Sequence, residues 1–303
     1  MPLFSYSPID RNTLIRSNTS QISSFLHSPE SRMLLWYQGK LIKGNAESLY
    51  FLFDELQGVK SYLSEPVYLG LHESLNYFAY QLNQWHTDFN NLELVNLRQA
   101  TLTVSDYHLG LLYHSQGILN WLSNHPFCSK CGSQTKVINS GHGRKCSNPD
   151  CGREHYPRID PAVIFSIINN TGPESKILLA RKSIWDKHRH SVVAGFIEPG
   201  ETLEDAVKRE AYEETGLKVN NVRYFDSQPW PFPGQIMLGF SCETEQWDIQ
   251  LIDHELESAN WFSADEIESK LKSDELKMPF QASISWQLIN RWFFSQKNYE
   301  LER

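Results

Sequence analysis

The sequence contains no run that approaches the ~20 consecutive apolar residues of a membrane-spanning helix. Its start, MPLFSYSPID, has no basic segment followed by an apolar one, as a secretory signal would have. Basic residues are outnumbered, 28 against 36 acidic ones, giving a formal net charge of −8. Because nucleic-acid binding over a whole surface depends on Lys and Arg at phosphates, such binding is not expected. We expect a globular cytoplasmic protein.

Cysteine is also scarce, but four of the five cysteines lie in two close pairs. Two residues separate Cys128 from Cys131, and four separate Cys146 from Cys151. Two such knuckles joined by a loop bring four thiolates to one Zn²⁺, in a closed site that has no position for catalysis. The alternative is two disulfides, which a reducing compartment disfavours, or unlinked thiols in the core. The fifth, Cys242, is expected in the hydrophobic core.

Hydrophobic patterning divides the chain into three parts. We predict an N-terminal α+β domain over residues 1–124, a zinc ribbon over 125–157, and an α/β layered domain over 158–303, where strands and helices alternate. Strands are expected at Met33–Gln38, Ser48–Phe53, Val67–Leu71, Tyr77–Leu82, 162–168, 176–180, 191–196, Val222–Phe225, Ile236–Cys242 and Asn260–Phe262, and helices at His108–Asn124, Leu203–Thr215 and Ser283–Phe294.

The helix expected at Leu203–Thr215 turns acidic side chains toward its apolar face. At about 100° per residue, three glutamates fall in the same arc as its small apolar residues. Carboxylates on a half-buried face repel one another and are costly to desolvate, and a divalent cation such as Mg²⁺ or Mn²⁺ resolves this conflict. A solvated acidic helix is the alternative. The three glutamates are Glu210, Glu213 and Glu214.

The same segment carries a motif of fixed spacing. Gly195, Glu201 and the run Arg209–Leu217 (REAYEETGL) match the Nudix box. The chain therefore resembles the Nudix hydrolases, which implies an α/β/α sandwich with a mixed sheet and Mg²⁺- or Mn²⁺-dependent hydrolysis of nucleoside diphosphate derivatives. The resemblance implies catalytic roles for Glu201, Glu210, Glu213 and Glu214, and metal ligation by the main chain of Ala194 and by Glu210, Glu213, Glu214 and Glu255.

A second motif, Ser227–Gly234 (SQPWPFPG), places three prolines around two aromatic residues. Such a stretch is stiff and makes a poor central strand, and its rings are suited to wall a base. By itself it also fits a rigid surface loop. After a Nudix box and a four-cysteine ribbon, it resembles the NADH pyrophosphatases, whose N-terminal domain is Nudix-like. That resemblance implies substrate contacts by Arg98, Tyr156, Phe196, Gln228, Pro229, Trp230, Pro231, Phe232, Pro233, Gly234, Gln235 and Ser285.

Two residues depart from that subfamily's pattern. Gln235 stands where the family loop usually has Ser, and Gly141 stands where one family member has an acidic substrate contact. Both concern substrate preference and not hydrolysis itself. His188 and His190 are able to approach phosphate, but a solvated loop is the simpler interpretation.

The resemblance implies hydrolysis of the pyrophosphate bond of NADH and NAD to nicotinamide mononucleotide and AMP, and a related reaction at the NAD cap of RNA. ADP-ribose or another dinucleotide is an alternative substrate. An alternative of another class is a zinc-ribbon RNA-binding regulator with an inactive Nudix domain. The resemblance also implies a homodimer, for which the aromatic C-terminal helix offers a surface to bury. Its aromatic residues are Trp286, Trp292, Phe293 and Phe294.

Overall fold

A computed structural model describes residues 9–44, 48–100, 104, 106–252 and 254–301. The chain forms two compact units. The C-terminal unit contains Asp160–Pro229 and the residues from Gln235 onward. The N-terminal unit contains the described residues up to Ile159 together with Trp230–Gly234. No helix among the described residues is both long and apolar enough to cross a membrane.

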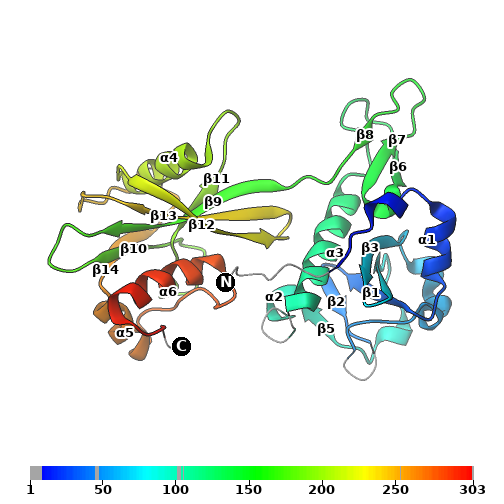
Figure 1. Ribbon diagram of the computed structural model, residues 1–303, viewed down its shortest axis with the longest axis horizontal. Helices are drawn as coiled ribbons and strands as arrows, with labels where there is room; N and C mark the ends of the chain where they lie inside the picture. The colour runs from blue at the N-terminus through cyan, green and yellow to red at the C-terminus, as the bar shows by residue number, and fades with distance from the viewer. Residues whose placement is uncertain (1–8, 45–47, 101–103, 105, 253, 302–303) are drawn as a thin grey trace. The chain divides into compact units, whose positions relative to one another are not determined.

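The C-terminal unit is built on a mixed sheet. Its strands are β9 (Asp160–Asn169), β10 (Lys176–Arg181), β11 (Val193–Phe196), β12 (Asn220–Trp230), β13 (Gln235–Glu243) and β14 (Ser258–Phe262). Their order is β12-β13-β9-β10-β14, with β11 paired to β9 (Figure 1). β13 runs parallel to β9, whereas β10 and β11 run antiparallel to it.

Helices cover both faces of this sheet. They are α4 (Leu203–Thr215), α5 (Ala264–Lys272) and α6 (Ile284–Lys297). Alternate residues of β9 point to opposite faces, as the pleat requires. Val163 and Phe165 pack in the cluster that contains the apolar residues of α4, whereas Ile164 packs in the cluster of α6. Figure 1 shows α4 and α6 on opposite sides of the strands. The expected α/β/α sandwich is confirmed.

The N-terminal unit repeats the connectivity of this sheet. Its strands are β1 (Ser31–Tyr37), β2 (Lys40–Ile42), β3 (Val67–His72), β4 (Leu75–Gln81) and β5 (Leu94–Asn96), in the order β3-β4-β1-β2-β5. Here too the second and third strands of the order, β4 and β1, run parallel. The other elements are η1 (Thr13–Ile15), α1 (Thr19–Leu26), η3 (Phe53–Tyr62), η4 (Thr87–Phe89), α2 (Leu97–Ala100) and α3 (Asp106–Asn124).

The cysteine segment forms a small three-stranded sheet within the N-terminal unit. Its elements are β6 (Thr135–Ile138), η5 (Asn139–Gly141), β7 (Gly143–Cys146) and β8 (Glu154–His155). The η5 turn lies against β3, where Gly141 adopts a φ of 97° and a Cβ would collide with Val67. Ser140 Oγ donates to the Arg16 carbonyl oxygen at 2.7 Å. The ribbon is therefore packed onto the N-terminal sheet.

Most of the expected elements are present, with three differences. The strand expected at Ser48–Phe53 is wrong, because only one bridge, between Met33 and Phe51, forms before η3 begins at Phe53. Helix α5 was not expected, although Ser263 and Glu266 form a capping box at its start. β12 extends through Pro229 to Trp230, which an edge strand tolerates. Cys242 is buried, as expected.

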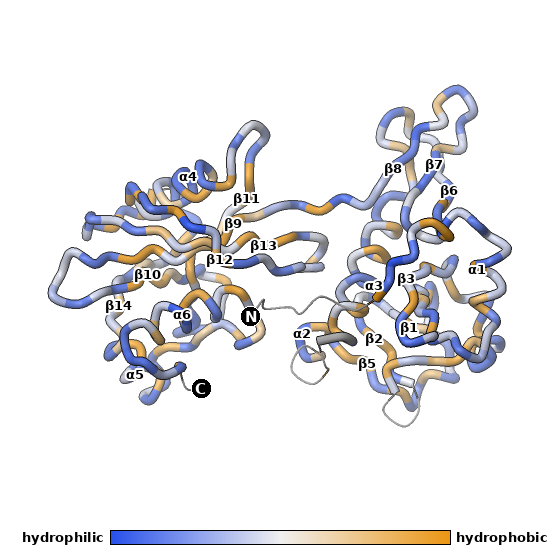
Figure 2. The backbone as a smooth tube through the Cα atoms, viewed as in Figure 1, coloured by the Kyte–Doolittle hydropathy of each residue, from blue (hydrophilic) through white to orange (hydrophobic). Residues whose placement is uncertain are grey.

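The aromatic helix expected to offer a dimer surface is instead part of the core. Trp286, Trp292 and Phe293 of α6 are at most 8% exposed and pack beneath the C-terminal sheet. Phe294 alone among the four is exposed, at 46%. The apolar face of α6 is thus used within its own unit. Figure 2 shows hydrophobic residues concentrated in the strands and hydrophilic residues in many loops and along much of α4.

Candidate active site and zinc site

Helix α4 is fixed at both ends by its own sequence. Thr202 caps the start, where its hydroxyl accepts from the Asp205 N–H at 3.2 Å, and Gly216 ends the helix with a φ of 71°. Glu214 is 1% exposed, and the Glu210 side chain is 13% exposed. The Glu213 side chain is 50% exposed. The expectation of three inward carboxylates therefore holds for two, because Glu213 lies at the edge of the buried arc.

Arg209 gathers the carboxylates of this helix and of the preceding turn. Its Nε and Nη2 donate to the two oxygens of Glu201 at 2.6 and 2.9 Å. Its Nη1 donates to Glu210 Oε1 at 2.8 Å and to Glu213 Oε2 at 2.9 Å. The hydrogen bond from Arg209 and a second from the Glu198 N–H lower the pKa of Glu201 to about 2. The guanidinium therefore holds Glu201 as a carboxylate in a fixed orientation.

Glu210 lies directly against the backbone of β11. A Cβ built on Gly195 would collide with the Glu210 carboxylate, so only glycine allows this approach. Ala194, the residue before it, pairs with Ile164 of β9. Burial raises the pKa of Glu210, and the charges of Glu213 and Glu255 raise it further against the opposing effect of Arg209. A cation beside this carboxylate would relieve the cost of its charge.

Lys182, which follows β10, lies beside the most buried carboxylate. Its Nζ is 3.8 Å from Glu214 Oε1 and 2.9 Å from Glu255 Oε2. The structure thus brings Glu255, from the segment before β14, to the same ammonium group as Glu214. Sequence reasoning did not single out Lys182, although its place directly after a buried strand was a usable signal.

These carboxylates fit a hard divalent cation. Mg²⁺ and Mn²⁺ prefer carboxylate and main-chain oxygens, and this donor set contains no thiol or imidazole. The close seat of Glu210 on Gly195 and the burial of Glu214 hold two such donors on one helix face. The candidate site is the inner face of α4, the adjacent backbone of β11, and the neighbouring Lys182 and Glu255.

The aromatic loop after β12 packs in the N-terminal unit. The rings of Trp230 and Phe232 lie 5.1 Å apart, tilted by 71°. The Arg98 guanidinium lies 4.8 Å from the Phe232 ring centroid and 5.7 Å from that of Trp230. Asn120 of α3 donates to the carbonyl oxygens of Pro231 and Pro233 at 3.5 and 3.3 Å. Three of the predicted substrate residues, Arg98, Trp230 and Phe232, therefore do lie together.

Two predicted substrate residues form hydrogen bonds within the C-terminal unit. Gln228 is fully buried, donating to the Ala282 carbonyl oxygen at 2.7 Å and accepting from the Ile284 N–H at 2.8 Å. The Ser285 hydroxyl is 2.7 Å from that of Ser191. Both tie the start of α6 to its neighbours, and the amide of Gln228 has little capacity left for a ligand.

The remaining predicted substrate residues are more accessible or lie in the backbone of the loop. Tyr156 is 61% exposed and donates to Glu154 at 2.8 Å, and Phe196 is 53% exposed. Gln235 begins β13, opposite Asp160 of β9. Pro229 belongs to the C-terminal unit, and Gly234 packs near the Arg158 carbonyl oxygen in the N-terminal unit.

The four paired cysteines converge as the zinc prediction requires. Their sulfurs all lie within 4.8 Å of one another, with Cys128 to Cys151 at 3.8 Å and Cys131 to Cys146 at 3.4 Å. Zn–S bonds of about 2.3 Å in a tetrahedron require sulfurs roughly 3.8 Å apart. No disulfide joins them. His155 Nε2 lies 3.3 Å from Cys128 Sγ and can donate to it, as a residue around a structural zinc does.

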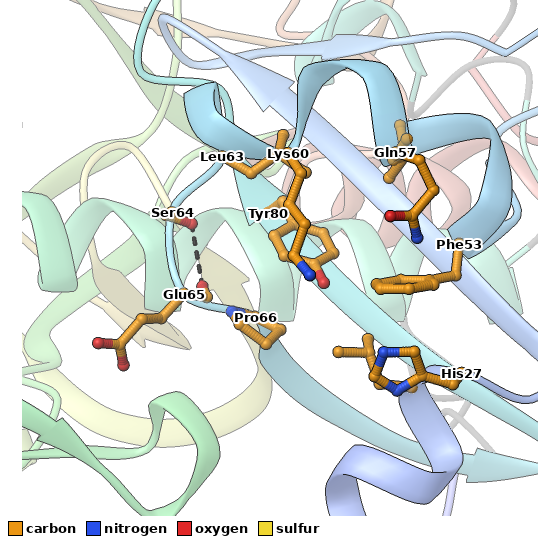
Figure 3. A pocket seen from close by; sticks show the side chains of 11 residues that line it. His27, Phe53, Gln57, Lys60, Leu63, Ser64, Glu65, Pro66 and Tyr80 are labelled. Carbon is orange, nitrogen blue, oxygen red and sulfur yellow. Dashed lines mark hydrogen bonds between the residues drawn. The ribbon is translucent and has the colours of Figure 1, made fainter.

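A separate pocket of about 290 Å³ lies in the N-terminal unit, between η3, the end of α1 and β4 (Figure 3). Phe53, Lys60 and Tyr80 are among its lining residues. None of the residues predicted for catalysis, metal binding or substrate binding lines it. Its walls are largely apolar, and it belongs to neither of the two metal sites.

Three family models match successive parts of the chain. The first is described as an NADH pyrophosphatase-like rudimentary NUDIX domain and matches residues 30–121. The second, an NADH pyrophosphatase zinc ribbon domain, matches residues 123–156. The third, a NUDIX domain, matches residues 158–281.

Known proteins match over most of the chain. A Chromobacterium violaceum protein named NAD-capped RNA hydrolase NudC is 36% identical over 222 residues, which are 73% of this chain and 78% of that protein. The chain belongs to the Nudix hydrolase family, and its zinc ribbon and N-terminal domain are of the NADH pyrophosphatase type. Membership implies a divalent cation, Mg²⁺ or Mn²⁺, in the Nudix domain and a structural zinc in the ribbon.

Two further relatives are longer than the region they share with this chain. Human NAD-capped RNA hydrolase NUDT12 is 36% identical over 202 residues, 64% of this chain and 43% of that protein. Nudix hydrolase 19, chloroplastic, from Arabidopsis thaliana is 37% identical over 228 residues, 70% of this chain and 52% of that protein. The chain therefore spans about half the length of these relatives.

Proposed function

We propose that the chain is a Mg²⁺- or Mn²⁺-dependent pyrophosphatase that hydrolyses NADH and NAD to nicotinamide mononucleotide and AMP, and that also removes the NAD cap from RNA. The observation that carries this proposal is the pair of inward carboxylates on α4, with Glu210 seated on Gly195 and Glu214 buried. Relatives named NAD-capped RNA hydrolases support the choice of substrate. The intact carboxylate set disfavours a regulator with an inactive domain.

In this proposal, Glu210 and Glu214 are the principal metal ligands, and the main chain of Ala194 with Glu213 and Glu255 completes the set. A cation held by these residues would lower the pKa of a water and offset the charge of the two phosphates. Arg209 keeps Glu201 ionised and oriented, so Glu201 is placed to position the attacking water. Lys182 holds Glu255 beside Glu214. Fixed donors of this kind supply orientation and electrostatic stabilisation.

Substrate recognition is proposed to rest on aromatic surfaces. Trp230 and Phe232, with Arg98 beside them, offer rings for a flat base, and stacking of this kind is tolerant of base identity. The further residues proposed to contact substrate are Tyr156, Phe196, Gln228, Pro229, Pro231, Pro233, Gly234, Gln235 and Ser285. For Gln228 and Ser285 the proposed role is positional and not direct contact, since both are buried and hydrogen-bonded within the C-terminal unit.

The test is a product analysis of the purified chain with NADH, NAD, ADP-ribose and NAD-capped RNA, each with Mg²⁺ and with Mn²⁺. We expect a mononucleotide pair from NADH and NAD, and a 5′-monophosphate end on the RNA. Faster cleavage of ADP-ribose than of every nicotinamide substrate would favour the alternative substrate. Binding of RNA with no hydrolysis of any substrate would overturn the proposal in favour of a regulator.

We further propose a homodimer, on the grounds of family resemblance, with a surface other than the apolar face of α6. Light scattering at micromolar concentration should give twice the chain mass, and a monomer would refute it. The three-domain division at residues 124 and 157 is proposed on the same grounds. A reducing compartment such as the cytoplasm is proposed because zinc ligation requires four of the cysteines as thiolates and no disulfide joins any of the five.

A further inference from the structure

Four basic side chains gather in the N-terminal unit, outside both metal sites. Arg11 and Arg16 flank η1, His114 lies on α3, and His142 follows the η5 turn of the ribbon. The charges that act on each histidine include both arginines. Three segments that are distant in sequence therefore converge here, and each contributes a group that can carry positive charge.

Backbone contacts hold these segments together. Asp10 and Leu71 of β3 exchange N–H to carbonyl hydrogen bonds at 2.9 and 2.8 Å, which fixes the chain just before Arg11. The Ser140 hydroxyl donates to the Arg16 carbonyl oxygen at 2.7 Å. The cluster is thus anchored to the sheet on one side and to the ribbon on the other.

Hydrogen-bond chemistry determines the state of the two histidines. Arg11 Nη1 donates to His114 Nδ1, and because a guanidinium only donates, Nδ1 must present a lone pair. His142 Nε2 is 2.7 Å from the Tyr68 carbonyl oxygen, which only accepts, so Nε2 carries the proton. The two ring centroids are 5.3 Å apart. His114 is therefore neutral.

The cluster holds guanidinium donors without a matching anion. Among the described residues, neither Arg11 nor Arg16 forms an ion pair with a carboxylate, and the buried Nε of Arg16 donates no hydrogen bond. The nearby Asp10 uses its Oδ1 to accept from the Asn12 N–H at 2.8 Å. Burial, together with the charges of the two arginines, lowers the pKa of His142 to about 4 against the opposing effect of the Tyr68 hydrogen bond. Arg16 as a whole is only half-buried, but a buried N–H of a charged group without an acceptor is costly, so a bound anion would stabilise this arrangement.

We propose that Arg11, Arg16, His114 and His142 form a binding site for a phosphate group. Guanidinium groups match the paired oxygens of a phosphate, and His142 becomes a double donor when an adjacent anion charges it. The phosphate belongs either to a small free anion or to the backbone of a polynucleotide, and the same four side chains would serve both. This site is separate from the hydrolysis proposed above and does not depend on it.

The test measures binding without Mg²⁺ or Mn²⁺, on the zinc-loaded full chain. Inorganic phosphate and a short single-stranded RNA with a 5′-hydroxyl end are titrated separately by calorimetry, with phosphorus NMR for the phosphate. Arg16→Gln should weaken binding by about 10- to 150-fold, the loss of a charge-assisted hydrogen bond. Arg223→Gln removes the same charge from an exposed position on β12 and should leave binding unchanged.

The two ligands distinguish the source of the phosphate. Arg16-dependent binding of RNA supports the site with a polynucleotide ligand, and Arg16-dependent binding of phosphate alone supports it with a small anion. If Arg16→Gln lowers the melting temperature of the protein, Arg16→Lys and Arg11→Gln are tested in its place. Weaker ligand binding by both variants again supports the site. The proposal would be overturned if every folded variant bound each ligand as tightly as the wild type does. It would also be overturned if the wild type bound neither ligand.

Discussion

The two units contain sheets of the same connectivity. In each unit a helical segment connects a first strand pair (β9 and β10, or β1 and β2) to a second (β12 and β13, or β3 and β4), and the residues of that segment differ. In the C-terminal unit this segment is α4, which directs Glu210 and Glu214 inward. In the N-terminal unit it is η3, whose Glu55 accepts from the Leu52 N–H at 2.6 Å and so caps its own helix. One fold thus carries a metal-type carboxylate face in one copy and an ordinary capping residue in the other. Sheet topology alone does not specify chemistry.

Removal of zinc should produce the largest difference between the two units, which is a difference in thermal stability. The ribbon packs on the N-terminal sheet, and structural zinc contributes roughly 10–16 kcal/mol of binding free energy in small zinc domains. Chelation should therefore lower the melting temperature of the N-terminal unit and leave the C-terminal transition nearly unchanged. Elemental analysis should find one zinc per chain. Freshly purified protein without zinc, with its four thiols paired as disulfides, would contradict this account.

Glu214→Gln should remove part of the carboxylate face that distinguishes α4 from η3, its counterpart in the N-terminal unit. The loss of a buried carboxylate ligand should reduce turnover by about 10³-fold or more, since metal positioning supplies several kcal/mol of transition-state stabilisation. The fold should survive, because less like charge remains on the inner face. Glu204→Gln changes an exposed glutamate of the same helix and serves as the control. Near-normal turnover by Glu214→Gln would refute the metal assignment.

Trp230→Ala should show what the N-terminal unit adds to the reaction. A stacked base contributes ~1–3 kcal/mol, so NADH binding should weaken about 5- to 150-fold. Hydrolysis of a pyrophosphate substrate without that base should hardly change. Tyr224→Ala, at an exposed aromatic residue of the same strand, is the control. Gln235→Ser should only shift the ratio of NADH to other dinucleotides. Equal slowing of every substrate by Trp230→Ala would make the loop structural.

His142 should produce the smallest of these effects, a pH dependence confined to the N-terminal unit. Its pKa is lowered from 6.5 to about 4, chiefly by burial. Below pH 6.5 the unfolded chain binds a proton that the folded chain excludes until about pH 4, so stability falls as the pH falls through this window. The full shift corresponds to about 3 kcal/mol, and because His142 is only partly buried the loss should be on the order of 1–2 kcal/mol. His142→Gln should flatten this part of the unfolding profile, and parallel profiles would contradict the assignment.

Much of the fold was predictable because its elements carry strong local signals. The apolar run of β9, the Thr202 cap and the Gly216 stop of α4, and the cysteine spacing each determine structure over a few residues. The strand at Ser48–Phe53 failed because its aromatic residues pack on the sheet without joining it, apart from the bridge at Phe51. The sequence of a short segment does not determine whether the segment pairs with a sheet or only packs against it, because that depends on distant elements.

The candidate site was predictable along α4 and less so away from it. Helical periodicity placed Glu210 and Glu214 inward, but Glu213 lies just outside the buried arc. The role of Arg209 as the common partner of three carboxylates depends on the turn that returns Glu201 to the helix. Lys182 reaches Glu255 through the pairing of β10 and β14, a long-range contact that periodicity does not encode.

Hydrolysis in water enriched with ¹⁸O tests the central claim most directly. The purified chain is incubated with NADH and Mn²⁺, and the masses of both products are measured by mass spectrometry. The carboxylate site on α4 predicts one labelled oxygen on the phosphate of reduced nicotinamide mononucleotide or of AMP, and no labelled product from Glu214→Gln. Label in a ribose, release of free nicotinamide, or undiminished labelling by Glu214→Gln would contradict pyrophosphate cleavage at this site.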